Sequence, residues 1–210
     1  FHIPNHPKLF VVADLLADLV APHGIALSPM AADLLPDDRE RDSGNSTRGS
    51  ASLYTYSTFN PRTEAALRAQ VAEGKAIARG NGRAYGDSAI SKTNTIHMRH
   101  FNRMISFDAE TGVLVAEAGV LAGDIISGFL PRGWFLSVTP GTKFVTLGGM
   151  IAADVHGKNH HVDGSFGSFV DWIDLLGPDG QVTRCSPVEK TELFRWTLGG
   201  MGLTGMLAMG

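Results

Sequence analysis

The pattern of apolar and polar positions divides the chain into a long N-terminal stretch and a more regular remainder. Apolar residues recur at three- and four-residue spacing in FVVADLLADLVAPHG, which predicts a helix within residues 1–35 that ends near Pro22 and Gly24. The following run, PDDRERDSGNSTRGSAS, is charged and small, as is typical of an exposed linker or loop. We therefore treat residues 1–52 as an unassigned extension and linker, and expect the organised domain to span 53–210.

Short helices and strands follow one another through residues 53–210. The patterns predict helices at 61–72, at 121–130 and within TELFRWTLGG, and strands in KAIARG, TIHM and GLTGMLAMG. Two hairpins are predicted, one turning at Glu110–Gly112 and the other at Pro178–Gly180. This mixture predicts an α+β fold rather than a regular series of β-α-β units. Because the last strand ends in an apolar run with no polar tail, we expect a fragment that is truncated at its C-terminus.

Composition narrows the function by exclusion. Of the 210 residues, 43% are hydrophobic and 19% are charged, and the net charge is −3. Such a balance gives no electrostatic footprint for nucleic acid. The apolar runs are shorter than the roughly 20 residues that span a bilayer, so no integral membrane segment is predicted. One cysteine, Cys185, excludes both an internal disulfide framework and a thiolate zinc site. The compartment stays open between the cytoplasm and a peripheral membrane association.

A glycine-rich loop follows the first strand of the organised region. Glycines in the run ARGNGRAYGDS permit positive φ angles and a close approach of the backbone to a ligand. Successive main-chain N–H groups of such a loop can form a nest for phosphate oxygens, and arginines add charge of the right sign. The loop lacks the Gly-Lys-Ser/Thr of a Walker A motif and the β-α-β context of a dinucleotide fingerprint. An ordinary tight loop is the alternative. The candidate residues are Ala78, Arg79, Gly80, Asn81, Gly82, Arg83, Ala84, Tyr85, Gly86, Asp87 and Ser88.

Two further glycine clusters strengthen the ligand hypothesis. The second comprises PGT at 140–142 and TLGG at 146–149, and the third is GGMGLTG at 199–205. Small residues there allow a flat ring or a pyrophosphate to lie against the backbone. Two separate glycine-rich loops suit a long ligand with a diphosphate in its middle.

Taken together, four motifs resemble a known flavoprotein family. ARGNGRAYGD, PGTKFVTLGGMIAADVHGKNHH, GSFGSFVDWIDLLGPDG and LFRWTLGGMGLTGM are similar to the PCMH-type FAD-binding domain of the vanillyl-alcohol-oxidase superfamily. The resemblance covers about residues 53–210 and implies a domain of two α+β subdomains. HGKNHH followed by GSFG is most similar to the branch that oxidises a prenyl-phosphate-linked ribose for bacterial cell-wall arabinose. It implies a sugar or lipid-linked sugar phosphate as substrate, and a partner reductase that completes an epimerisation.

The resemblance also implies a set of cofactor contacts. The loop from 78 to 88 would hold the FAD pyrophosphate through main-chain N–H groups. The flavin and its ribityl chain would lie along Gly141, Thr146, Leu147, Gly148 and Gly149, and the isoalloxazine along Ala153, Asp154, Val155 and His156, with Leu207 near the adenine. Many relatives attach the flavin covalently to a histidine of the first loop. Arg83 holds that place here, so we predict non-covalent FAD; Ala84 stands where serine is expected.

The segment VHGKNHH, at 155–161, carries the candidate catalytic residues. His156 and His160 have the i, i+4 spacing of a helical metal pair, yet Gly157 and Asn159 are weak helix formers, and no metal is predicted. By resemblance, His156 and Lys158 face the substrate side of the flavin. Lys158 would bind a phosphate or hydroxyl, or stabilise negative charge on reduced flavin; His156 would orient the substrate or shuttle a proton. The alternative for His160 and His161 is a polar loop with satisfied histidines.

Other functional readings remain open. Another sugar-alcohol or aldonolactone oxidase of the same superfamily, or a non-catalytic nucleotide-binding module, fits the same motifs. Cys185, Trp172 and Trp196 are expected in the core, and Asp171 and Asp174 on the polar face of a hairpin. Tyr85 suits the flavin edge and core packing equally well.

Overall fold

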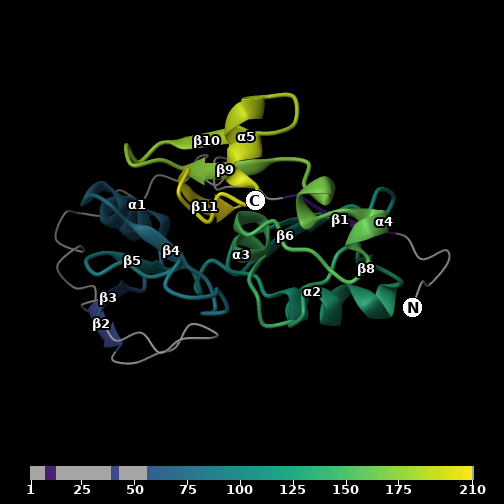
Figure 1. Ribbon diagram of the computed structural model, residues 1–210, viewed down its shortest axis with the longest axis horizontal. Coiled ribbons are helices and arrows are strands. Elements are labelled where there is room, and N and C mark those ends of the chain that lie inside the picture. Colours follow the sequence, from purple (N-terminus) through teal and green to yellow (C-terminus); the bar gives the residue numbers. More distant parts are fainter. Residues whose placement is uncertain (1–7, 13–38, 43–55, 210) are drawn as a thin grey trace, which may run out of the picture.

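The computed structural model describes residues 8–12, 39–42 and 56–209, which form three small sheets and short helices (Figure 1). One sheet has the order β6-β7-β1-β8, from Met104–Phe107, Val113–Ala116, Lys8–Val12 and Phe135–Leu136. A second has the order β10-β9-β11, from Val182–Cys185, Ile173–Leu176 and Met206–Met209. The third has the order β2-β3-β5-β4, from Arg39–Asp42, Tyr56–Phe59, Thr95–His97 and Ile77–Arg79.

Short helices connect and cover these sheets. They are α1 (Glu64–Ala72), α2 (Ala122–Phe129), α3 (Leu147–Ala152), α4 (His160–Asp163) and α5 (Thr191–Thr197), with 3₁₀ turns at Leu130–Arg132 and Phe166–Phe169. Figure 1 shows α3 and β11 near the centre of the molecule, with α1 and α2 toward opposite sides. The α+β expectation is confirmed, as are both hairpins, α1, α2, α5 and the strands β4, β5 and β11.

The N-terminal expectations need correction. Phe10–Val12 belong to β1, which runs parallel to β7 and to β8, so the predicted helix is wrong there; its remainder lies outside the described residues. A short β-branched apolar run fits a strand as well as a helix, and here its distant partners decide. Arg39–Asp42 form the edge strand β2 rather than a loop. A run of charged residues has no apolar alternation and gives no strand signal.

The sequence patterns did not predict two helices, α3 and α4, because their glycine and histidine residues give little helix signal. The α3 segment LGGMIA contains two glycines, which disfavour a helix interior. Thr146 nevertheless caps it, its Oγ1 accepting a hydrogen bond from the Gly149 N–H at 3.2 Å. The α4 segment HHVD is a single turn after Asn159.

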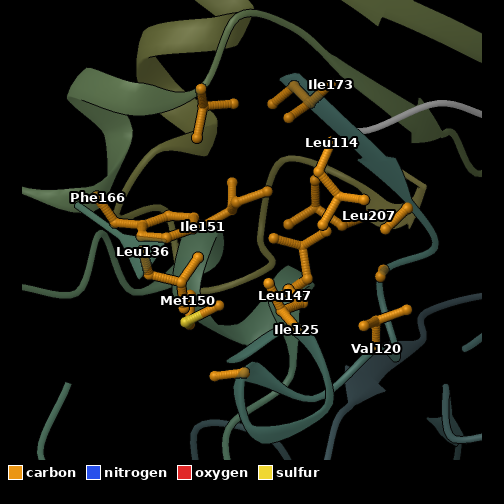
Figure 2. Packing of buried hydrophobic residues seen from close by; sticks show 14 of the residues in the cluster. Leu114, Val120, Ile125, Leu136, Leu147, Met150, Ile151, Phe166, Ile173 and Leu207 are labelled. Atoms are coloured by element: carbon orange, nitrogen blue, oxygen red, sulfur yellow. The ribbon is translucent and has the colours of Figure 1, made fainter. Parts of the chain in front are cut away.

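The main core lies between two sheets and α2 and α3. Figure 2 shows Leu147, Met150 and Ile151 of α3 among side chains from both sheets, including Leu114, Ile173 and Leu207. Their i, i+3, i+4 spacing places all three on one face of the helix. The small residues on the rest of α3 are thereby left to line a pocket.

Four residues in and around β9, β10 and α5 test the packing expectations. Cys185 is fully buried, as predicted. Trp196 is instead 72% exposed, and Trp172 is half-buried beneath Arg184, whose Cζ lies 3.7 Å from the ring centroid. Asp174 is buried and accepts two hydrogen bonds from Arg184, at 2.9 and 2.8 Å, so its placement on a polar face is wrong. The paired guanidinium makes that burial tolerable.

Candidate functional site

A pocket of about 290 Å³ opens between the first two glycine-rich loops. The end of β4, the exposed face of α3 and strand β11 complete its walls. Most residues predicted for the cofactor line it: Ala78, Gly80, Asn81, Gly82, Arg83, Ala84, Tyr85, Ser88, Gly141, Thr146, Gly148, Gly149, Ala153, Val155 and Leu207. The pocket thus joins segments that lie more than 100 positions apart in the sequence.

Six predicted residues lie outside the lining, and nine unpredicted residues belong to it. The six are Arg79, Gly86, Asp87, Leu147, Asp154 and His156. The nine are Ala89, Met98, Ala118, Pro140, Thr142, Val145, Ala152, Met201 and Gly202. Pro140, Thr142, Met201 and Gly202 fall within glycine clusters recognisable in the sequence, whereas Met98 and Ala118 have no such signal.

The first loop offers uncommitted hydrogen-bond donors. None of the hydrogen bonds among the described residues uses the main-chain N–H groups of Asn81, Gly82, Arg83 or Ala84, all of which line the pocket. Gly82 and Gly86 have φ angles of 63° and 61°, the left-handed region that glycine adopts without strain. Consecutive free amides of this kind match the nest that binds phosphate oxygens.

Arg79 supports this loop from behind. Its side chain is 1% exposed, and a Cβ at Gly82 would lie 2.8 Å from Arg79 Nη2. The φ angle of 63° therefore favours glycine at position 82, and a Cβ there would also press on the guanidinium. Arg79 consequently contributes buried positive charge near the loop rather than a direct wall of the pocket.

The second loop and α3 shape the wall of the pocket and offer no free main-chain N–H groups at Leu147 and Gly148. The Leu147 N–H donates to Val120 O at 2.7 Å, and the Gly148 N–H donates to Ala118 O at 2.8 Å. These amides are committed to the protein, and the Leu147 side chain is fully buried in the core rather than facing the pocket. A Cβ at Gly148 would lie 2.9 Å from Ala118 Cβ, so no larger residue fits. The small residues of α3 thereby form a flat apolar wall.

Glu117 fixes the segment that ends in this wall. The carboxylate is 1% exposed and accepts hydrogen bonds from Arg103 N at 2.6 Å, Nε at 2.9 Å and Nη2 at 2.7 Å. Hydrogen bonding to Glu117 raises the pKa of Arg103, which stays charged. The next residue, Ala118, lines the pocket. An ion pair between the buried Glu117 and the half-exposed Arg103 thus holds the backbone beside the site.

The candidate catalytic residues lie just beyond the pocket lining. Val155 lines the pocket, while His156 and Lys158, which follow it, are exposed to solvent. Asp154, at φ 40°, turns the chain, and its Oδ1 accepts a hydrogen bond from the Gly167 N–H at 2.8 Å. An antiparallel bridge pairs His156 with Ser165. The structure thus places His156 at the rim, on a segment held at both ends.

The three histidines form a row. The ring centroids of His156 and His160 are 5.2 Å apart, and those of His160 and His161 are 5.7 Å apart. His160 Nδ1 lies 3.1 Å from Gly157 O, while Asn159 donates to Ser137 O at 3.1 Å. Nowhere in the described ranges do three His, Cys, Asp or Glu side chains gather as a metal site would require.

Comparisons with known proteins identify the family to which this chain is similar. Residues 59–186 match the model of a family described as an FAD-binding domain. Over 133 residues the chain is 44% identical to decaprenylphosphoryl-beta-D-ribose oxidase of Mycolicibacterium smegmatis, covering 62% of this chain and 29% of that protein. It is 29% identical over 130 residues to L-gulonolactone oxidase of Mus musculus, covering 61% of this chain and 29% of the relative.

A third relative is a putative D-arabinono-1,4-lactone oxidase of Neurospora crassa, 26% identical over 128 residues, or 61% of this chain and 23% of that protein. The chain thus spans less than a third of the length of each of these relatives. Among the described residues, no helix combines the length and the apolar character needed to cross a bilayer.

The pocket fits FAD by its own chemistry. Uncommitted amides from Asn81 to Ala84 suit the pyrophosphate, and the glycine and alanine wall of α3 suits a flat ring. Met98 and Leu207 add apolar surface for the adenine base of FAD. With the family model matching more than half of its length, the chain belongs to the FAD-binding domain family, and FAD is its cofactor.

Proposed function

We propose that this chain forms the flavin-binding part of an oxidoreductase that oxidises a sugar hydroxyl, with a ribose carried on a prenyl phosphate as the substrate. The observation that carries the proposal is the pocket between two glycine-rich loops, one with free amides and one with a smooth wall. The 44% identity to decaprenylphosphoryl-beta-D-ribose oxidase supports the substrate class. A partner reductase acting on the keto product would complete an epimerisation.

Bound FAD supplies the acceptor for a hydride that leaves the C–H bond of the alcohol. The protein binds and orients the reactants. Amides from Asn81 to Ala84 hold the pyrophosphate, and Gly148 and Gly149 let the ring system lie against α3. This division places phosphate affinity in the first loop and ring placement in the second.

His156 and Lys158 act at the rim, where both side chains are exposed. The Lys158 ammonium attracts the phosphate of a lipid-linked sugar or stabilises negative charge beside the flavin. The His156 imidazole is suited to orient the hydroxyl or accept its proton. The bond between Asp154 and Gly167 fixes the start of their segment, so both groups are presented from a defined backbone.

Anaerobic reduction of the flavin tests the substrate class. The purified protein, reconstituted with FAD, is mixed with decaprenylphosphoryl ribose, and loss of the oxidised flavin absorbance is followed. We expect rapid bleaching by the lipid-linked sugar. Matches of 29% and 26% to lactone oxidases favour a second candidate, oxidation of an aldonolactone, so L-gulono-1,4-lactone is tested in parallel. A flavin that neither compound reduces contradicts both candidates and favours a binding module.

Two variants distinguish FAD binding from the reduction of the flavin by substrate. His156→Ala and Lys158→Met are expected to lower the reduction rate about 100-fold or more while FAD affinity stays unchanged. His161→Ala is the matched control, because His161 is also exposed but lies further along the row of rings. Wild-type reduction rates in both rim variants would remove the roles assigned to His156 and Lys158.

A further inference from the structure

Two cations lie close to the Phe144 ring where the first and second glycine loops meet. The Cζ atom of Arg83 is 5.5 Å from the Phe144 ring centroid, and the Nζ atom of Lys143 is 5.7 Å from it. Both distances are within the roughly 6 Å over which a cation is attracted to an aromatic ring. Arg83 belongs to the first loop and lines the pocket, so the ring connects the two loops.

The main chain of Phe144 is fixed as well. Its carbonyl accepts a hydrogen bond from Asn81 Nδ2 at 2.9 Å, and its N–H donates to Thr142 Oγ1 at 3.3 Å. The neighbouring Lys143 carbonyl accepts from the Gly123 N–H of α2 at 2.9 Å. The second loop is thus anchored to a helix, and the first loop is tied to it through Asn81 and Arg83.

We propose that Phe144 is a clasp that holds the first loop closed over FAD and thereby sets the rate at which FAD dissociates. The inference rests on the proposed FAD site. Opening of the first loop would withdraw the amides of Asn81 to Ala84 from the pyrophosphate. Because Arg83 and its neighbours are held across the gap by the Phe144 ring, loss of the ring speeds that opening.

The position of Phe144 distinguishes a clasp from ordinary packing. The side chain is 47% exposed, outside both core clusters, and is not part of the pocket lining. Its removal therefore costs little stability and leaves the walls of the pocket intact. A selective effect on cofactor exchange is the signature expected of this residue.

The dissociation rate of FAD measures the clasp directly. Holoprotein is diluted into buffer, and the fluorescence of released FAD is followed for the wild type and for Phe144→Ala, Phe144→Leu and Phe144→Tyr. Loss of one exposed cation–π contact corresponds to roughly a two- to fivefold change in a rate constant. We therefore expect FAD release to be about fivefold faster, or more, in the Ala and Leu variants. The Tyr variant keeps the π face and should release FAD at the wild-type rate.

Phe135→Ala is the matched control, since Phe135 is also a partly exposed phenylalanine outside the pocket lining, at 39%, but lies on β8 rather than in a glycine-rich loop. It should leave the release rate unchanged. Wild-type release from the Leu variant would show that apolar contact suffices and would overturn the cation–π clasp. Equal rates in all variants would overturn any clasp. A wild-type protein that binds no FAD would instead overturn the proposed site itself.

Discussion

The Gly167 N–H donates a hydrogen bond of 2.8 Å to the carboxylate of Asp154, closing the histidine-rich segment between them into a loop. A second bond, from the Phe166 N–H to Val155 O at 2.8 Å, reinforces the closure. Asp154 has a φ of 40°, which is uncommon for residues other than glycine. One residue therefore both turns the chain after α3 and fastens the far end of the loop that carries His156 and Lys158.

Replacing Asp154 tests this fastening. Asp154→Ala should lower the free energy of unfolding by about 2 kcal/mol, because the hydrogen bond is lost and alanine tolerates the left-handed region poorly. Asp154→Asn keeps an acceptor oxygen and tolerates that region, so it should lose less than half as much. Urea unfolding of the three proteins measures the difference. Equal loss in both variants would show that charge, not geometry, matters at this position.

Two glycine-to-alanine changes should have opposite effects. A Cβ at Gly80 would collide with Thr146 Oγ1, the cap of α3, so Gly80→Ala should weaken FAD binding and cost about 1–3 kcal/mol of stability. A Cβ at Gly128 of α2 meets no atom within 4 Å, so Gly128→Ala should stabilise by about 0.5–1 kcal/mol. FAD titration and thermal unfolding report both. Unchanged FAD affinity in Gly80→Ala would contradict the tight contact.

Cys185 should be unreactive in the folded protein. Burial, with the nearby Asp174 carboxylate, raises the pKa of the thiol from 9.0 to about 11. The folded state therefore keeps the proton that the unfolded state loses, so stability is full below pH 9 and declines as the pH rises toward 11. Iodoacetamide should label Cys185 at neutral pH only after urea is added. Rapid labelling of native protein would contradict its burial.

Acid denaturation should release FAD from the protein as the intact, unmodified cofactor. No histidine or cysteine is found among the residues that line the pocket in the described part of the chain, and Arg83 cannot form a covalent bond to the flavin ring. After precipitation with trichloroacetic acid, the yellow colour should remain in the supernatant. A fluorescent protein band on a denaturing gel would show covalent attachment.

Local chemistry made much of the site predictable. Clustered glycines with positive φ have few uses other than tight turns and close approach, and Gly82 and Gly86 adopt that conformation. Leu147 could not be placed, because its direction depends on the phase of α3, a helix that its two glycines concealed. The burial of Arg79 could have been predicted from the sequence. The alternation of side chains in β4 places Arg79 on the same buried face as Ile77, opposite Ala78, which lines the pocket.

The parts that escaped prediction depend on distant partners. Nothing in KLFVV indicates that Phe10 pairs with Val113, and nothing local to Met98 or Ala118 shows that both face the pocket. Such positions are set when separate segments assemble. A single sequence records the propensity of each segment and carries much less information about its neighbours in space.

The position of β1 has a consequence for the order of events during synthesis. Its residues are translated long before those of its neighbours, since Leu9 pairs with Leu136 and Phe10 with Val113. About 100 further residues must be translated before that strand meets either neighbour. Pairings so remote in sequence slow a folding reaction and leave early segments exposed to wrong associations. We therefore expect chaperones to raise the yield of folded protein during synthesis.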